Sequence, residues 1–177
     1  MPLSITIMLD VEIDKLTNSI ENVITGETFD TIILSVLLSD ARHIKKKDWQ
    51  FNWKKELQDD RKQVFRLTTL ANDTVIQGLL SLEDKGDHVF MHLLESALFN
   101  KGKSKVYVGV PANLVAFACK VSFESGYGGF ISFVSKTLLR QHYQKTLGAK
   151  ILYGDTMVID TPEALKLVNR YFKSTIL

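Results

Sequence analysis

The stretch Tyr107-Val-Gly-Val-Pro-Ala-Asn-Leu114 runs from a short apolar segment through a glycine-containing turn into an apolar helix. The start of a helix has unpaired backbone N–H groups and the positive end of the helix dipole. Such a turn can hold a phosphate on its backbone amides without a dedicated cationic side chain. The stretch therefore predicts a binding site for a nucleotide-like cofactor.

Length and composition describe an ordinary soluble protein. The chain has 177 residues, of which 45% are hydrophobic and 24% are charged. This is the size of one domain, so we expect a single domain over residues 1–177. No apolar run reaches the roughly 18 residues of a membrane-spanning helix. The start of the chain lacks the basic segment of a secretory signal, so we expect a cytoplasmic protein with no membrane partner.

Charge and cysteine content limit the partners and metal sites that we expect. A net charge of +2 is too small to predict a nucleic-acid partner, and we expect none. A minor alternative is nucleic-acid binding through residues 45–47, with Trp49 and Trp53 stacking on bases. The single cysteine, Cys119, lies in an apolar run and is expected to be a buried thiol. Histidine and cysteine do not occur at metal-ligand spacing, so no metal is expected.

Apolar spacing predicts the elements that precede the turn. Helical spacing predicts an amphipathic helix over residues 14–24, ending near Gly26. Residues 30–38 fit either a buried strand or a buried helix. Strands are predicted at three consecutive segments, which together suggest an antiparallel meander: residues 64–70, 74–82 and 88–96.

A well-marked helix follows the turn. It is predicted from Pro111 to about Ser125, with proline in its first turn and Gly126 just beyond its end. The remaining elements are a strand, a helix, two strands and a last helix, at residues 130–134, 137–147, 150–153, 156–159 and 162–172. This order predicts an α+β (mixed α/β) fold with a central, mostly antiparallel mixed sheet flanked by helices. The G-x-G-x-x-G spacing of a Rossmann site is missing.

Three segments resemble the GNAT superfamily of acyl-CoA-dependent N-acetyltransferases. Val106-Tyr-Val-Gly-Val-Pro111 resembles the R/Q-x-x-G-x-G/A loop of that family, with Gly109 as its first glycine and departures at Val106 and Pro111. His142-Tyr-Gln-Lys-Thr-Leu-Gly-Ala149 resembles the family's Y-x-x-x-G-F segment with one extra residue. Glu95-Ser-Ala-Leu-Phe-Asn100 is similar to a sequence in a sub-group of uncharacterised bacterial members. The resemblance covers about residues 65–153.

The resemblance implies a GNAT-like fold and an N-acetyltransferase that moves an acetyl group from acetyl-CoA to an amine by direct attack. The acceptor would be a small-molecule or peptide amine, and a homodimer is possible in this family. The coenzyme A pyrophosphate would bind a set of residues around the turn, namely Lys103, Val108, Gly109, Val110, Ala112, Asn113 and Leu114. Pro111 offers no N–H to a phosphate.

The resemblance also implies two catalytic residues. Glu95 would be the base, directly or through water, and Tyr143 would be the acid that protonates the departing sulfur. Glu95 could instead be a surface carboxylate or pair with Lys101 or Lys103. Tyr143 could instead be a core residue. The alternative function is a non-catalytic coenzyme A-binding or protein-interaction module with a GNAT-like fold, which the departure at Pro111 favours.

Overall fold

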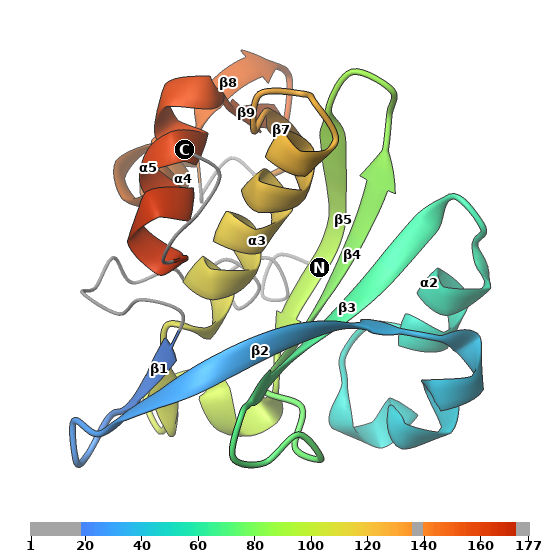
Figure 1. The fold of residues 1–177 in the computed structure, drawn as a ribbon, viewed down its shortest axis with the longest axis vertical. Helices are drawn as coiled ribbons and strands as arrows, with labels where there is room; N and C mark the ends of the chain where they lie inside the picture. The colour runs from blue at the N-terminus through green and yellow to red at the C-terminus, as the bar shows by residue number, and fades with distance from the viewer. Residues whose placement is uncertain (1–18, 136–139, 173–177) are drawn as a thin grey trace.

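The computed structural model describes residues 19–135 and 140–172, and Figure 1 shows their arrangement around one twisted sheet. The strands are β1 (Ser19–Asn22), β2 (Thr28–Val36), β3 (Lys62–Thr69), β4 (Gly78–Asp84), β5 (Val89–Ser96), β6 (Tyr107–Val108), β7 (Ile131–Val134), β8 (Lys150–Tyr153) and β9 (Thr156–Ile159). The α-helices are α2 (Trp53–Gln58), α3 (Val110–Glu124), α4 (Arg140–Leu147) and α5 (Thr161–Tyr171). Three 3₁₀ turns complete the set: η1 (Leu38–His43), η2 (Lys46–Asp48) and η3 (Leu98–Asn100).

The sheet has the order β6-β1-β2-β3-β4-β5-β7-β9-β8 in the described part of the chain. Every neighbouring pair is antiparallel except β5 and β7, which are parallel. The prediction of an α+β fold with a mixed, mostly antiparallel sheet is therefore confirmed. None of the described helices is long and apolar enough to cross a membrane.

The antiparallel meander predicted in the middle of the chain is formed by β3, β4 and β5. Leu67 pairs with Gly78 and Leu80 pairs with Leu94, which fixes the register of the three strands. The connection between β3 and β4 is longer than the predicted turn, because it extends over residues 70–77. The undecided segment before the meander is a strand, β2, which pairs with β3 along six positions.

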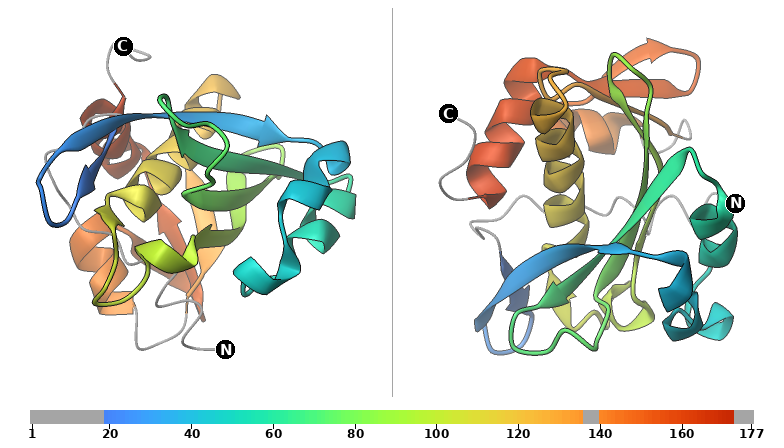
Figure 2. Two further views of the ribbon diagram at one scale, coloured as in Figure 1. Left: turned by 90° about the horizontal axis from the view of Figure 1, so that it is seen from below. Right: turned by 45° about the vertical axis from the view of Figure 1, so that its right-hand side comes forward.

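Helices cover the two faces of the sheet unequally. One face, here called the α face, carries α3, α4 and α5, and the opposite η face carries η1, η2 and α2 (Figure 2). Neighbouring residues of β4 separate the two cores, because side chains alternate across a sheet. Leu80 belongs to the large core under α3, whereas Leu79 packs with Val36, Val64 and Trp53 under α2. Each face therefore has its own hydrophobic cluster.

Helix α3 confirms the strand–turn–helix prediction. Gly109 precedes the helix with φ at 97°, in the left-handed region that glycine adopts without a Cβ clash. Gly126, with φ at 84°, lies just beyond the helix end, as predicted. Cys119 is fully buried within α3, and burial raises the pKa of its thiol well above the ordinary value.

The predicted helix over residues 14–24 is wrong where the structure describes it. Residues 19–22 form β1, and the rest of the prediction before residue 19 lies outside the described residues. The Asn22 side chain accepts the N–H groups of Ile24 and Thr25, which closes a turn into β2. Val23 and Ile24, placed on an apolar helix face by their spacing, are exposed in this turn.

The C-terminal elements agree with the prediction. Strand β7 pairs with β9, which pairs with β8, and α5 starts at the N-cap Asp160. Helix α4 begins at Arg140, while residues 137–139 of the predicted helix lie outside the described residues. Helices α3 and α5 pack against each other over the sheet (Figure 1).

Candidate functional site

Strand β5 separates from β7 soon after the two strands meet. The parallel pairing is limited to Val89 with Ile131 and Phe90 with Ser132, whereas β5 pairs with β4 at seven positions. Past Phe90, the described residues provide no strand partner on the β7 side of β5. Residues 91–96 therefore present an open strand edge between the α face and the η face.

A β-bulge accompanies this separation. Leu82 pairs with Met91 and Ser81 pairs with Leu93, so His92 is an extra residue in β5. A bulge bends its strand and increases the local twist, and bulges often lie next to active sites. The bulge lies in the part of β5 that no longer pairs with β7. This geometry places the open edge at the centre of the sheet.

The start of α3 lies close to the end of β5. The Asn113 N–H donates to the Gly109 carbonyl, so it already belongs to the helix and is unavailable to a ligand. In an α-helix the N–H of Leu114 is used in the same way. Among the predicted donors, the helix pattern leaves the N–H groups of Gly109, Val110 and Ala112 without a helical partner. All three residues are buried.

Gly78 lets α3 approach the sheet at this point. A Cβ on Gly78 would lie 2.7 Å from Cγ1 of Val110 and 2.9 Å from Cδ1 of Leu114. Real Cβ atoms do not approach other atoms so closely, so a side chain at this position would force Val110 and Leu114 to shift. Gly78 pairs with Ser96, the last residue of β5. The missing side chain therefore sets the distance between the first turn of α3 and the end of β5.

Asn100 fixes the chain that leads to the turn. Its side-chain Nδ2 donates to Oε1 of Gln77 at 2.8 Å, and its Oδ1 accepts the N–H of Tyr107 at 3.1 Å. Tyr107 begins β6, where Val108 pairs with Glu21 of β1. Asn100 is buried, so these bonds are shielded from water. Val108, predicted at the cofactor, thus lies in a strand that a buried amide anchors.

Glu95 is held by four hydrogen-bond donors. Its Oε2 accepts the backbone N–H of Gln50 at 2.7 Å and the ammonium of Lys101 at 2.9 Å. Its Oε1 accepts the N–H of Phe51 at 3.1 Å and the indole N–H of Trp53 at 2.9 Å. A carboxylate has about four lone-pair positions, and all are engaged here. The alternative of a pair with Lys101 is the arrangement observed, and the role of Glu95 as a base stays a prediction.

The lysines of the loop before the turn lie in different environments. The side chain of Lys101 is buried against Glu95, so it is committed to that carboxylate. Lys103, predicted to contact the cofactor, is exposed. Its position leaves it accessible to an anion but shows no arrangement that would hold one.

Tyr143 lies on the α face of the sheet. It is fully buried in the core under α3, and its ring packs edge-to-face with Phe133 at 5.7 Å between centroids. Glu95 contacts the segment that leads into α2, which covers the η face. The two predicted catalytic residues therefore lie on opposite faces of the sheet. The open edge of β5 lies between these faces.

A cavity of about 730 Å³ lies on the η face, and sequence reasoning did not find it. It is lined by η1, η2, the loop between β3 and β4, and η3. Its apolar lining includes Val36, Ile44, Trp49, Ile76, Leu98 and Phe99. Trp49 directly precedes the segment that Glu95 holds, and η3 directly follows β5. The cavity therefore adjoins the end of β5 on the side opposite α3.

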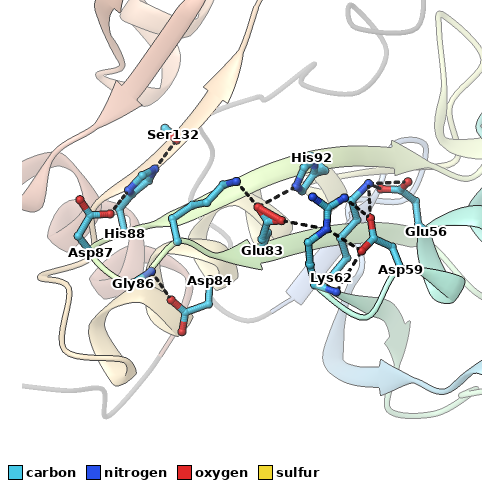
Figure 3. A network of polar contacts seen from close by, with 12 residues as sticks. Glu56, Asp59, Lys62, Glu83, Asp84, Gly86, Asp87, His88, His92 and Ser132 are labelled. Carbon is cyan, nitrogen blue, oxygen red and sulfur yellow. Dashed lines mark hydrogen bonds and ion pairs between the residues drawn. The ribbon is translucent and has the colours of Figure 1, made fainter.

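A second polar network extends along β3, β4 and β5 (Figure 3). Glu83 forms an ion pair with Lys85, and its Oε2 lies 3.6 Å from Nε2 of His92 in the bulge. The ammonium of Lys85 holds the pKa of Glu83 below its ordinary value, while burial lowers the pKa of His92. Arg61 connects Glu83, at 3.9 Å, to Asp59, and Lys62 connects Asp59, at 3.7 Å, to Glu56 of α2, at 3.0 Å.

A serine–histidine–aspartate chain lies at one end of the same network (Figure 3). One ring nitrogen of His88 lies 2.9 Å from Oγ of Ser132, and the other lies 2.6 Å from Oδ1 of Asp87. The order of groups is that of a nucleophile, base and orienting acid. However, the Asp87 side chain is 84% exposed and Ser132 is buried. Water thus reaches the orienting group rather than the nucleophile, so we assign this chain to the structure of the sheet.

Among residues 19–135 and 140–172, no group of three or more histidine, cysteine, aspartate or glutamate side chains is arranged to hold a metal ion.

Comparison with solved structures identifies the fold. A chain from a KacTA–DNA complex aligns with 79% of this chain. The alignment covers 99% of that other chain, with a TM-score of 0.55 and 14% sequence identity. The ribosomal-protein-S18-alanine N-acetyltransferase of Escherichia coli matches 73% of this chain and 92% of its own, with a TM-score of 0.52 and 14% identity. The chain has the GNAT fold. AtaTR bound with AcCoA shares this fold over 78% of this chain and 98% of its own, with a TM-score of 0.51 and 15% identity.

No protein-family model and no curated protein sequence matches the chain. At these sequence identities, the similarity between this chain and the solved structures shows the fold alone. The recognition of that fold from the residues around Gly109 is confirmed.

The expectation of no nucleic-acid partner, which was drawn from the small net charge, is wrong. One of the similar structures, the KacTA–DNA complex, contains DNA. A small net charge measures the whole chain, whereas nucleic acid meets a local surface. The Trp53 side chain is 1% exposed, so it cannot stack on a base as the minor alternative supposed.

Proposed function

We propose that this protein is an N-acetyltransferase that uses acetyl-CoA and an amine acceptor. The observation that carries the proposal is the open edge of β5 next to the start of α3. An extended ligand can pair with an exposed strand edge through its own amide groups, and the pantetheine arm of coenzyme A has such groups. The cofactor-bound AtaTR structure, which shares the fold, supports the same choice of cofactor.

The residues at the open edge fit this cofactor in part. The left-handed turn at Gly109 and the N–H groups of Val110 and Ala112 form the start of a helix, which attracts phosphate. The hydroxyl of Ser96 is buried and has no hydrogen-bond partner in the described residues, although it lies next to Gly78 and the first turn of α3. A ligand group here would satisfy that hydroxyl.

The reaction requires two proton transfers, which would take place on opposite faces of the sheet. Bound acetyl-CoA supplies the thioester carbonyl that an amine can attack, with a C–N bond forming as the C–S bond breaks. Tyr143 would give its phenolic proton to the departing sulfur from the α face. The proton released by the amine would leave through water on the η face, where the carboxylate of Glu95 is already saturated with donors.

Glu95 is accordingly proposed as a positioning residue. Its four contacts hold the segment from Gln50 to Trp53 against the end of β5, and that segment continues from the wall of the cavity. With Glu95 in a positioning role, the rate acceleration would come from the positioning of the two bound molecules and from the acid.

Calorimetric titration with acetyl-CoA tests the cofactor, with ATP and NADH as controls that also carry phosphates. We expect acetyl-CoA to bind at micromolar concentration and more tightly than either control. Binding of all three ligands with equal affinity would show that the start of α3 is only an anion site. No binding of acetyl-CoA would remove the proposal.

The acid is tested by Tyr143→Phe. We expect kcat to fall roughly a hundredfold with little change in the KM for acetyl-CoA, because the phenol would act in the transition state. The measurement is thiol release from acetyl-CoA in the presence of a panel of amines. Tyr171→Phe is the matched control, because Tyr171 is an equally buried tyrosine on α5. An unchanged kcat in the first variant would exclude Tyr143 as the acid.

A second candidate function is a non-catalytic module that binds coenzyme A or a protein. The burial of Gly109, Val110 and Ala112 favours its protein-binding form, because a pyrophosphate needs access to these amides. Pro111 removes one further donor from the same turn. Binding of acetyl-CoA without thiol release for any amine would favour this candidate over the enzyme.

A further inference from the structure

Residues 37–55, here called the basic lobe, carry an excess of positive charge. The lobe contains η1, η2 and the start of α2, and η1 packs against α2 on the η face (Figure 2). Its exposed cations are Arg42, Lys45, Lys46, Lys47, Lys54 and Lys55. Its exposed carboxylates are those of Asp40 and Asp48. Because the whole chain has a net charge of only +2, positive charge is concentrated on this lobe.

The cations of the basic lobe differ from other surface lysines in their partners. Lys120, Lys150 and Lys166 each form an ion pair with a carboxylate on their own surface. Within residues 19–135 and 140–172, by contrast, none of the six cations of the lobe forms an ion pair. Arg42 donates to a ring nitrogen of the neighbouring His43 at 3.3 Å. The described protein therefore leaves the charge of the lobe available to an anionic partner.

Exposed apolar side chains adjoin these cations. Leu37 and Leu38, at the start of η1, are 64% and 52% exposed. Leu98 and Phe99 of η3 are 58% and 40% exposed, and they line the same cavity as Trp49 of the lobe. Exposed apolar side chains with a polar rim mark sites of contact with proteins or membranes. The basic lobe and η3 thus form a surface that is both cationic and apolar.

We propose that the basic lobe and η3 bind the surface of an anionic lipid bilayer. The lysines and Arg42 would contact the lipid phosphates. The side chains of Leu37, Leu38, Leu98 and Phe99 would enter the boundary between the headgroups and the acyl chains. Stable attachment to a bilayer takes two such signals together, one apolar and one cationic. The expectation of no membrane partner came from the lack of a membrane-spanning run, whereas this contact would lie on the membrane surface.

Other partners fit this surface less well. A nucleic acid would be attracted by the cations, but single strands also stack on exposed aromatic rings. Trp53 is 1% exposed, and the exposed leucines offer no ring for stacking. A second copy of the chain would place one excess of positive charge against another. A bilayer with anionic lipids uses both the cations and the leucines.

Co-sedimentation of the full chain with lipid vesicles tests the inference. One set of vesicles is phosphatidylcholine alone, and the other contains about 30% phosphatidylglycerol, which supplies the negative surface potential. We expect binding to the anionic vesicles and little binding to the neutral ones. Raising the salt from about 0.05 M to about 0.5 M should weaken the binding, because salt screens the exposed lysines.

The charge contribution is tested by the triple variant Lys45→Ala, Lys46→Ala and Lys47→Ala. We expect it to bind anionic vesicles about a hundredfold more weakly, since each lysine near an anionic surface contributes about a factor of five. The matched control replaces three exposed lysines outside the lobe with alanine, namely Lys145, Lys150 and Lys166. The control removes the same charge, so it should bind more tightly than the variant of the lobe.

The apolar contribution is tested by the double variant Leu37→Ser and Leu38→Ser, which keeps every cation of the lobe. We expect it to bind anionic vesicles about tenfold more weakly, because two half-exposed leucines no longer enter the bilayer. The fluorescence of Trp49 offers a second readout, since Trp49 lies in the lobe and Trp53, the other tryptophan, is buried. Brominated acyl chains should quench it in the wild type and less in the double variant.

Several outcomes would overturn the inference. They include no binding to anionic vesicles at low salt, equal binding to both kinds of vesicle, and equal binding by the lysine variant and its control. Unchanged vesicle binding by the leucine variant would reduce the contact to adsorption by charge. A single-stranded oligonucleotide that displaces the protein from vesicles, and that the wild type and the leucine variant bind equally, would assign the lobe to nucleic acid instead.

The inference goes beyond the proposed function and does not depend on it, because vesicle binding needs neither cofactor nor acceptor. The replaced side chains of the lobe are exposed, so the urea midpoints of both variants should match that of the wild type. Acetyl-CoA should bind the wild type and both variants alike, since the lobe lies on the η face and α3 on the α face. Vesicle binding without acetyl-CoA binding would leave the inference intact and contradict only the proposed function.

Discussion

Glu95 and Ser96 are neighbours at the end of β5, yet their side chains have opposite environments. Both residues are 1% exposed. Glu95 lies on the η face with four donors around its two oxygens. Ser96 lies on the α face, and its hydroxyl has no hydrogen-bond partner among the described residues. One strand end therefore carries both a fully paired polar group and an unpaired one.

This difference separates a polar group that stabilises the fold from one that is open to a ligand. Buried polar groups are almost always paired, so a buried group without a partner needs an explanation. Glu95 is explained by the chain itself, because its partners tie the segment before α2 to β5. Ser96 is not explained by the chain, and it faces the first turn of α3, where the proposed cofactor would bind. The paired carboxylate of Glu95 thus serves the structure, whereas the unpaired hydroxyl of Ser96 is open to a ligand.

Removing the carboxylate of Glu95 should have the largest effect on stability. We expect Glu95→Gln to lower the free energy of unfolding by about 3–5 kcal/mol, because it leaves the buried ammonium of Lys101 without its charge partner. Urea denaturation measures this loss. The control is Glu124→Gln, whose carboxylate is 55% exposed and pairs with Lys120 on the surface of α3. A loss of similar size in both variants would contradict the buried role of Glu95.

A methyl group at Gly78 should have the next largest effect. We expect Gly78→Ala to cost about 1–3 kcal/mol in urea denaturation, because the new Cβ overlaps Val110 and Leu114. The variant should also weaken acetyl-CoA binding if the first turn of α3 holds the cofactor. Adding Val110→Ala should recover part of the stability, since it removes the nearer contact. No recovery in the double variant would mean that the strain lies elsewhere.

The strand–turn–helix unit at α3 was predictable because its signals are local. Gly109 supplies a left-handed turn, Pro111 fits the first turn of a helix, and Gly126 ends it. The same local logic failed at residues 19–22, which belong to the segment 14–24 with apolar residues at helical spacing but form a strand. Their pairing with β2 and β6 depends on residues far along the chain. Spacing alone carries no information about such partners.

The candidate site was predictable only in outline. The sequence pointed to Glu95 and Tyr143, but the donors around Glu95 include backbone N–H groups 44 and 45 residues away. Backbone donors leave no trace in residue types. The bulge at His92 and the cavity beside Trp49 likewise arise from how separate segments pack.

His92, in the bulge of β5, is a third polar group, and its surroundings both favour and disfavour its protonated form. Burial, which is the main cause, and the ammonium of Lys62 lower its pKa below 6.5, while the carboxylates of Glu83 and Glu56 act against that shift. The ring of Phe90 packs edge-to-face against the His92 imidazole, with 4.6 Å between the ring centroids. The unfolded chain therefore binds a proton more readily than the folded one. Stability should be complete above pH 6.5 and should decrease as the pH falls through the lowered pKa.

We expect His92→Gln to reduce this decrease between about pH 6.5 and 5, a range above the ordinary pKa of carboxylates. Urea denaturation at several pH values measures it. His43→Gln serves as the control, because His43 is exposed. An acid-induced loss of stability that is the same in the wild type and in His92→Gln would show that other groups cause it.

The smallest effect on stability should come from Ser96→Ala. The variant removes a hydroxyl that is buried without a partner, so it removes a desolvation cost along with the group. We expect a change within about 0.5 kcal/mol in urea denaturation. Ser122→Ala is the matched control, because the equally buried hydroxyl of Ser122 donates to the Phe130 carbonyl at 2.8 Å, and its loss should destabilise the protein.

The two serines also distinguish a missing ligand from a packing defect. If Ser96 awaits a ligand group, Ser96→Ala should weaken acetyl-CoA binding while leaving the free protein as stable as before. Ser122→Ala should do the reverse, because its hydroxyl serves only the chain. If Ser96→Ala changes neither stability nor acetyl-CoA affinity, its unpaired hydroxyl is a tolerated defect. The contrast with Glu95 would then describe packing alone.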